Sequence, residues 1–548
     1  MQRVVNPPNN LFVNGNPAEG TPGTIVTAEW LNAVQEELAN IIEMSGGELN
    51  PEDNAQIAKR VMHKDWVDVR GYNNSISAAL DAIGDVDAIL YVAGGVSLDT
   101  DTTIPENIGL KIRYPGTITL GDYNLTINGP FEGSPACFIY NGVGSVSFST
   151  SSVDVRDPVW FGFSTTALGV ENQTSLNNAI AACAPGDVLR LRPGIYTVAG
   201  RWTINKACKI DLNGATLHFS TDAEYQGVYM SSSDCEIFNG SIKGPQHAVS
   251  KLWQSGIYAT GTGPSGYISN INIHDLTIHG WGFSGVSVGF TKDFHIERVS
   301  VYDISHRGIE IRSCMDGIIA ENIVHDIDDG NANPNSYGIV VTKGEGPESS
   351  HPPSKRINVC NNVVYNVKYW EALDTHGGEE ISFIGNTVRN CRMGLMIGST
   401  SDFYSAPTRC KVIGNTFSVD HSVVPIMETT YGITILGARA DEYAGVGNRI
   451  CEDSIVEGNI IAGFASGIYS RNSRNTVIKG NTISDLSSHG IYLLGETINI
   501  VVSENAIYNI DPDVGICGIW INRGSSGMYP GDPSGVVSNN SIEAGALP

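Results

Sequence analysis

The sequence lacks long apolar runs, paired cysteines and a high content of charge. No run of about 18 apolar residues occurs, and residues 1–8 carry no apolar signal-peptide core, so we expect neither a membrane span nor a secretory signal. The 10 cysteines stand singly, with no Cys-x-x-Cys. This argues against zinc-ribbon and thioredoxin-like sites, and we expect buried free thiols, no cofactor and no metal. With 62 glycines and only 17% charged residues, the composition favours a turn-rich β protein.

The net charge is −25 over 548 residues. Such a charge argues against binding to bulk nucleic acid or an anionic membrane. It also argues mildly against a strongly acidic polymer as substrate, unless a local basic patch overrides the field. The length exceeds that of one ordinary core, so several domains or a repeat array are expected.

Residues 1–62 form a separate, partly helical module. Residues 27–43 predict a helix that Thr27 caps and Gly46–Gly47 ends, and a second helix is expected to begin near Pro51. The apolar positions of the first helix have a 3-4-3 spacing typical of a coiled-coil seam, although a helix that packs on its own chain is an open alternative. These positions are Leu31, Val34, Leu38 and Ile41.

The stretch Pro22–Glu37, PGTIVTAEWLNAVQEE, resembles a recurrent phrase at the N-terminus of phage and prophage tail fibres. The resemblance implies that residues 1–62 attach the protein to a phage tail or baseplate.

Two similar units follow, over residues 63–156 and 157–548. The first is predicted to hold a helix over Ile76–Ile83 and a strand over Ala88–Ala93. The second is predicted to hold a Trp-Phe-Gly strand over Pro158–Gly162, a capping helix over 175–183 and a strand over 187–196. This order resembles the beginning of pectate-lyase-like right-handed β-helices. The family's Gly-Asp-Gly-x-x-Asp-Asp is absent after Gly162, so the resemblance supports the cap but no role for those acids.

From about residue 200 the chain repeats two phrases with a shortest period of 23 residues, as from Gly285 to Gly308. One phrase is Gly followed by alternating aliphatic residues, and the other places an Asn before a short apolar run. Such a period predicts an all-β parallel solenoid, a single-stranded right-handed β-helix, in which stacked coils bury each other's apolar faces. The Asn column is expected to form a structural ladder inside the turns. Its members are Asn322, Asn362, Asn386, Asn415, Asn459, Asn481 and Asn505.

The segment WEALDTHGGEE, residues 370–380, breaks the repeat with acids and a histidine. Aligned with the Gly phrase, Asp374 and His376 point outward from the sheet. Glu310 shares the column of Asp374 two coils away, at about 9–10 Å. A carboxyl pair near the upper end of about 6.5–9.5 Å suits an inverting glycosidase. We therefore predict Asp374, Glu310 and His376 as catalytic residues on an exposed face.

Further outward side chains are predicted to bind substrate. Charged candidates surround the acids, and aromatic residues continue the column, where their faces suit the apolar side of sugar rings. These candidates are Arg312, Glu371, Asp303, Arg307, Tyr469, Tyr492 and Trp520. Solvated surface charge and aromatic residues at a subunit interface are the structural alternatives.

As a whole the sequence resembles phage tailspike depolymerases. The resemblance implies a homotrimer in the virion tail, made in the bacterial cytoplasm, which adsorbs to a host and cleaves its capsule, exopolysaccharide or O-antigen. Glycosidic hydrolysis is the leading hypothesis. A lyase, with Arg312 as the cation and His376 as the base, and a non-catalytic receptor-binding spike remain as alternatives.

Overall fold

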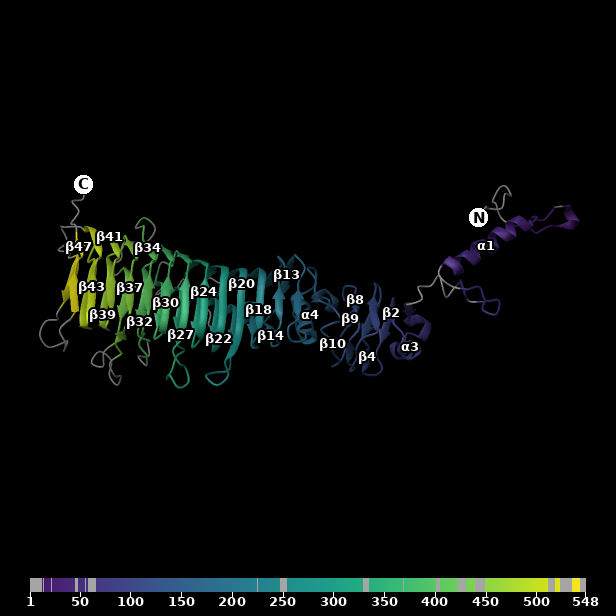
Figure 1. The fold of residues 1–548 in the computed structure, drawn as a ribbon, viewed down its shortest axis with the longest axis horizontal. Helices are drawn as coiled ribbons and strands as arrows, with labels where there is room; N and C mark the ends of the chain where they lie inside the picture. Colours follow the sequence, from purple (N-terminus) through teal and green to yellow (C-terminus); the bar gives the residue numbers. More distant parts are fainter. Residues whose placement is uncertain are drawn as a thin grey trace.

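The computed structural model shows a long stack of parallel β-coils with a separate helix at its N-terminal end (Figure 1). The structure describes residues 12, 14–20, 22–44, 48–54, 56–57, 66–223, 225–246, 254–328, 335–367, 369–400, 405–420, 422, 430–438, 449–510, 518–522 and 535–542. Of the described helices, none is long and apolar enough to span a membrane.

The N-terminal module contains a 3-10 helix, η1 (Pro17–Glu19), and the helix α1 (Ala28–Met44). The Trp30 N–H donates a hydrogen bond to Thr27 Oγ1 at 3.3 Å, so the predicted cap is confirmed. Three positions of the predicted seam remain well exposed: Leu31, Leu38 and Ile41. The predicted stop at residues 46–47 lies outside the described residues, as does most of the second helix.

A short solenoid of three small parallel sheets comes next. The predicted helix has the expected bounds as α3 (Ile76–Ile83), preceded by η2 (Val69–Tyr72). The first sheet has the order β1 (Trp66–Asp68), β2 (Ala88–Val92), β5 (Ile108–Ile112), β8 (Phe131–Gly133). The second has the order β10 (Val146–Phe148), β7 (Leu125–Ile127), β4 (Thr102–Ile104), and the third β3 (Gly95–Ser97), β6 (Thr117–Thr119), β9 (Phe138–Ile139).

The start of the main solenoid differs from the prediction in three details. The Trp-Phe-Gly segment is a 3-10 helix, η3 (Pro158–Phe161), rather than a strand, because the Asp157 side chain caps it at the Val159 N–H. The capping helix α4 (Gly169–Ala182) begins earlier than predicted, where the Glu171 carboxylate accepts a hydrogen bond from the Leu168 N–H. The strand expected over 187–196 is split in two by Pro193–Gly194.

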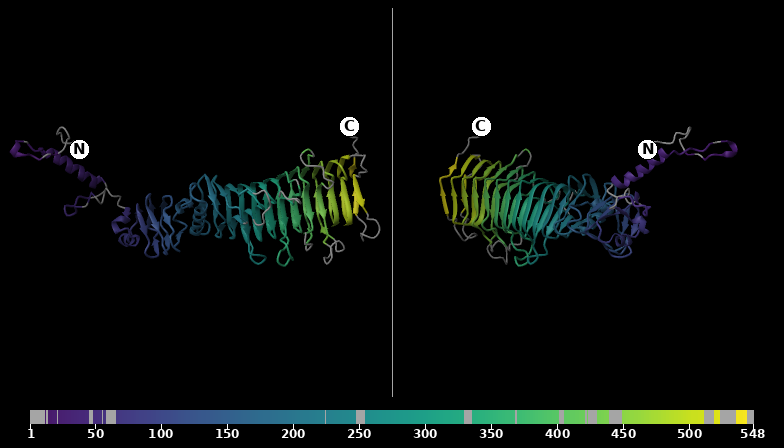
Figure 2. Two further views of the ribbon diagram at one scale, coloured as in Figure 1. Left: turned by 180° about the vertical axis from the view of Figure 1, so that it is seen from behind. Right: turned by 45° about the vertical axis from the view of Figure 1, so that its right-hand side comes forward.

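Each coil of the main solenoid contributes strands to two long parallel sheets (Figure 2). The 13-stranded sheet consists of β14 (Trp202–Ile204), β17 (Gln226–Met230), β19 (Ser255–Thr260), β21 (Ser284–Gly289), β23 (Arg307–Arg312), β26 (Tyr337–Thr342), β29 (Glu371–His376), β32 (Met393–Gly398), β35 (Tyr431–Leu436), β36 (Cys451–Glu452), β39 (Ser466–Arg474), β42 (Ile491–Ile498) and β45 (Ile519–Asn522).

The 24-stranded sheet covers the other sides of the coils. It consists of β11 (Val155–Arg156), β12 (Val188–Arg190), β13 (Ile195–Val198), β15 (Lys209–Asp211), β16 (Thr216–Phe219), β18 (Cys235–Lys243), β20 (Ile268–Trp281), β22 (Thr291–Ile304), β24 (Met315–Ala320), β25 (Ile323–Ile327), β27 (Lys355–Cys360), β28 (Val363–Tyr365), β30 (Glu379–Ile384), β31 (Thr387–Arg389), β33 (Lys411–Ile413), β34 (Thr416–Ser418), β37 (Ile455–Glu457), β38 (Ile460–Ala462), β40 (Val477–Lys479), β41 (Thr482–Leu486), β43 (Ile500–Ser503), β44 (Ala506–Ile510), β46 (Gly535–Ser538) and β47 (Ser541–Ile542).

The interior of the stack is the predicted aliphatic core. The residue that follows the Gly position is fully buried in coil after coil, and Ile519 packs partly buried against the same core. Fully buried examples are Ile309, Ile339, Leu395, Ile433, Ile468 and Ile491. All nine described cysteines are free, and all but the half-buried Cys360 are buried, as expected.

The Asn ladder is also confirmed. Each Asn side-chain amide donates a hydrogen bond to the amide oxygen of the Asn in the next coil, at 2.9–3.0 Å from Asn322 through to Asn505. Asn540 extends the ladder by one further coil. The fold class is therefore confirmed as an all-β parallel β-helix with a small helical N-terminal part.

Candidate functional site

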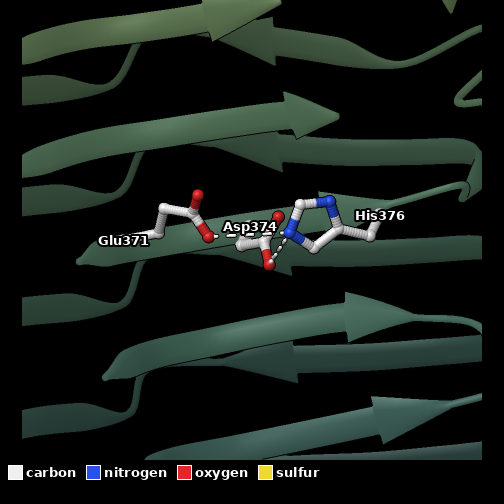
Figure 3. A group of neighbouring side chains, drawn as sticks. All are labelled: Glu371, Asp374 and His376. Atoms are coloured by element: carbon white, nitrogen blue, oxygen red, sulfur yellow. Dashed lines mark ion pairs between the residues drawn. The ribbon is translucent and has the colours of Figure 1, made fainter. Parts of the chain in front are cut away.

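The predicted catalytic column lies on the outer face of the 13-stranded sheet, on β23, β26 and β29. Glu310 pairs with Val340, and Val340 pairs with Asp374, so the two carboxylates stand two coils apart as predicted. Arg312 and His376 occupy the neighbouring column, with Thr342 between them. Because Leu373 is in the core, alternation directs Asp374 to the outer face, beside His376 (Figure 3).

The expectation that these acids are exposed is wrong. Asp374 is 0% exposed, and Glu310 and Glu371 are each 1% exposed. In the coils on either side of Asp374, its column holds Val340 and Met396, which are themselves buried. Apolar side chains from neighbouring coils thus remove the carboxyl group from water, which a reading of one strand does not reveal.

Glu310 is an anion enclosed by hydrogen-bond donors. The Ser287 hydroxyl donates to Glu310 Oε2 at 2.8 Å, Arg307 forms an ion pair with Oε1, and Arg312 Nε lies 3.5 Å from Oε1. Burial alone favours the neutral acid, but the charges of Arg312 and Arg307 outweigh it and hold the pKa of Glu310 below its usual range. Glu310 is therefore ionised at neutral pH and fixes two guanidinium groups.

Asp374, Glu371 and His376 form a second cluster, on the single strand β29. His376 Nε2 lies 3.3 Å from Asp374 Oδ2 and 3.7 Å from Glu371 Oε2 (Figure 3). On the other side of the ring, His376 Nδ1 lies 3.1 Å from the Ser399 carbonyl oxygen, to which a protonated Nδ1 donates. Both ring nitrogens thus face acceptors, as an imidazolium requires.

The protonation of this cluster is shifted by burial and by charge. Burial raises the pKa of Asp374 well above its usual value, and the nearby Glu371 carboxylate raises it further. Burial disfavours the charged imidazole, but the Asp374 and Glu371 carboxylates outweigh it and raise the pKa of His376 to about 10. His376 therefore keeps its proton at neutral pH. Burial also favours the protonated form of Asp374 more than exposure to water would.

The same three side chains could hold one metal ion. One donor atom from each of Glu371, Asp374 and His376 lies within 4.8 Å of the others. Apart from the approach of His376 Nε2 to Asp374 Oδ2 and Glu371 Oε2, the four carboxylate oxygens of Glu371 and Asp374 have no hydrogen-bond partner within the described part of the chain. Two carboxylates and an imidazole form a donor set that zinc or another transition metal accepts.

The exposed surface of the site is cationic. His376, Arg307 and Arg312 have side chains that are 24%, 25% and 22% exposed. Arg307 also lies over the rings of Tyr337 and Phe283, at 5.7 and 4.9 Å from their centroids. A ligand that approaches this face meets the imidazolium and the two guanidinium groups before it meets the buried acids.

The aromatic column lies on the C-terminal side of the cluster. Tyr469, Tyr492 and Trp520 pair in register, and the rings of Tyr492 and Trp520 stack at 4.9 Å. Tyr431 joins them from the column of Glu371 and stacks on Tyr469 at 5.1 Å. Asp303 is the predicted residue that the structure does not bring to the site, since it is exposed at a bend of β22 in the other sheet.

The sequence prediction omitted several residues of the site, among them Tyr337 and Ser287. Tyr337 directly precedes Gly338. Arg307 and Glu371 occupy the same position in their own coils, directly before the Gly position. Ser287 precedes Glu310 in the outer column. The repeat alignment alone contained the signal for both residues.

Comparison with known proteins gives partial matches. Residues 330–514 match the family described as "Periplasmic copper-binding protein (NosD)". No curated protein matches the chain.

Several solved structures align with the chain at low identity. One is ORF18 of Geobacillus virus E2, with 14% identity and a TM-score of 0.34, covering 67% of this chain and 59% of that chain, less than two thirds of its length. A hyperthermoactive exopolygalacturonase from Thermotoga maritima has 12% identity and a TM-score of 0.49, covering 64% and 91%. The A-module of the mannuronan C-5 epimerase AlgE6 from Azotobacter vinelandii has 15% identity and a TM-score of 0.41, covering 72% and 99%.

Proposed function

We propose that the protein is a phage tailspike that binds and depolymerises a bacterial surface polysaccharide. The observation that carries the proposal is the cluster on β29, in which two carboxyl groups and an imidazolium meet on an outer sheet face beside an aromatic column. Cleavage of a glycosidic bond needs a proton for the leaving oxygen and a base or nucleophile near it. This cluster offers both.

In the proposed mechanism, His376 is the member of the cluster that meets the sugar, because it is the one with an exposed part. It donates a proton to the glycosidic oxygen, and the Asp374 carboxyl group, 3.3 Å from Nε2, replaces that proton. The Glu371 carboxylate is left as the base that takes a proton from the attacking water.

Glu310 has a different part in this proposal. Its ion pairs with Arg307 and Arg312 make it a fixed anion that positions both guanidinium groups at the surface of the site. Replacement of Glu310 then impairs the site through the two arginines rather than through a lost proton transfer.

A polysaccharide lyase is the second candidate, favoured by one observation. The exposed members of the site are cations, and a lyase needs a cation to neutralise the carboxylate of a uronic acid before β-elimination. Arg307, Arg312 and His376 fit that need.

The experiment that tests the proposal is incubation of the protein with purified capsules, exopolysaccharides and O-antigens. We expect one member of the panel to gain new reducing ends without the ultraviolet absorbance of an unsaturated sugar. That absorbance would establish a lyase instead. Retained binding without either signal would contradict the enzymatic proposal and establish an adhesin.

Attachment and assembly belong to the same proposal. We propose that residues 1–62 bind the phage tail and that three chains associate through the α1 seam, since Leu31, Leu38 and Ile41 are exposed on the helix. The virion tail is then the place of action, at the outside of the host cell. Light scattering of the intact chain at micromolar concentration is expected to give a trimer, and a monomer would contradict this assembly.

A further inference from the structure

The outer column of the catalytic cluster continues toward the N-terminus and reaches two tyrosines. From Asp374 the register passes through Val340, Glu310 and Ser287 to Tyr258 and then Tyr229. Tyr229 is therefore five coils from Asp374, or about 24 Å. In the other direction, Trp520 is also five coils from Asp374, through Met396, Thr434, Tyr469 and Tyr492. Aromatic side chains thus lie on both sides of the acids in one column.

The N-terminal pair differs chemically from the C-terminal stack, because each tyrosine has an arginine on its ring. Arg201 lies over the ring of Tyr229, with its guanidinium 5.1 Å from the centroid. Arg312 lies over Tyr258 at 5.8 Å and donates a hydrogen bond to its hydroxyl oxygen at 3.2 Å. The two rings are 5.8 Å apart and both are half-buried.

Arg201 is an exposed guanidinium without an acidic partner among the described residues. Most arginines of the main solenoid contrast with it: Arg190 and Arg298, for example, each form an ion pair with an aspartate at 2.8 Å. In a chain with a net charge of −25, an arginine that no acid neutralises is a local positive site. Its hydrogen-bond donors are available to a carboxylate from outside the protein.

We propose that Tyr229 and Arg201 bind a carboxylate-bearing sugar of the polysaccharide, an inference that rests on the proposed function. The tyrosine ring offers a surface for the apolar face of the sugar. The planar guanidinium presents paired donors that match the two carboxylate oxygens. The substrate is accordingly an acidic polysaccharide that lies along the column. The cations near the column overcome the repulsion between this polymer and the negatively charged protein.

The same placement determines where the polymer is cut. A chain held between Tyr229 and Trp520 extends several sugars to each side of Asp374. The cleaved linkage is then an interior one, and the first products are large fragments rather than single sugars released from an end.

The test uses the panel member that the protein cleaves, in its native form and after chemical reduction of its carboxyl groups to alcohols. Binding is measured by calorimetry with the full-length Asp374→Asn protein, so that the polymer stays intact. We expect Arg201→Ala to weaken binding of the native polymer about tenfold, as the loss of a charge-assisted contact does. We expect Arg201→Lys to recover only part of this loss, and carboxyl reduction to remove the difference between Arg201 and its alanine variant.

Arg389→Ala is the matched control. Arg389 is also exposed, and it lies on β31 of the other sheet, so its loss is expected to leave binding unchanged. A cleaved polymer without carboxylates would overturn the inference, as would Arg201→Ala with unchanged affinity, or equal effects of Arg201→Ala and Arg389→Ala. In each of those cases the depolymerase proposal stands. If no member of the panel is bound or cleaved, the proposed function fails and this inference fails with it.

Discussion

Glu310 and Asp374 are both buried carboxyl groups on the same column, yet their replacement by the neutral amide should have different costs. Glu310→Gln removes a negative charge that is paired with Arg307 and Arg312 and accepts a hydrogen bond from Ser287. Asp374→Asn replaces a carboxyl group whose pKa burial raises well above its usual value, so less charge is lost.

The partners and the burial of each carboxyl group determine the expected loss of stability. Removal of one partner from a buried ion pair typically costs about 3–5 kcal/mol, because the remaining charge is left without compensation. Glu310 is 1% exposed, so solvent screening does not reduce this cost appreciably. Replacement of a carboxyl group whose charge is disfavoured by burial alters mainly hydrogen bonds, each worth about 1 kcal/mol. We therefore expect the free energy of unfolding to fall several times more for Glu310→Gln than for Asp374→Asn.

The assay is urea unfolding of both variants and the parent, followed by tryptophan fluorescence at pH 7. The expected order of unfolding midpoints is parent, then Asp374→Asn close below it, then Glu310→Gln clearly lower. Equal midpoints for the two variants would refute the inferred difference in charge between Glu310 and Asp374. A greater loss for Asp374→Asn would show that the charge of Asp374 contributes more to stability than that of Glu310.

Three further predictions concern the stack and its protonation. Asn415→Ala removes hydrogen bonds from the Asn386 amides, the Phe383 carbonyl and Asn459. Each buried group left unsatisfied costs about 1–3 kcal/mol. The variant should therefore lower the urea midpoint far more than the outer-face control Asn358→Ala. Ile433→Ala should cost about 2–5 kcal/mol in the same assay because Ile433 is fully buried, and a cost near zero would contradict the stacking of the core. Because the pKa of His376 is raised, the folded protein binds the imidazole proton more tightly than the unfolded chain does. Protonated His376 therefore contributes its full stabilisation below pH 6.5, and this stabilisation is lost as the pH rises toward about 10. The melting temperature should therefore fall less between pH 7 and pH 10 for His376→Gln than for the parent, and equal falls would contradict the shift.

Much of the fold and the register of the site could be predicted from the sequence. The recurrence of Gly and Asn sets which residues stack, so it placed Val340 between Glu310 and Asp374 and found the ladder from Asn322 to Asn505. A repeat reports stacking directly, because the same position recurs in every coil.

Burial and pairing of the site residues could not be predicted in the same way. Neighbours in space decide whether an outward acid is exposed, and the column of Asp374 has the buried Met396 in the next coil. The partners of Glu310 include Arg307, three residues away on the same strand, which was predicted to point outward but not to pair with Glu310. At Pro158 the local cap by Asp157 outweighed the resemblance to a strand.

The most direct test of the central claim is the rate at which Asp374→Asn releases reducing ends from the polysaccharide that the parent cleaves. General acid–base catalysis contributes about 10²–10⁴-fold, so we expect a rate at least ~100-fold below that of the parent, with polysaccharide binding retained. Turnover close to that of the parent would contradict it and would place the chemistry away from β29.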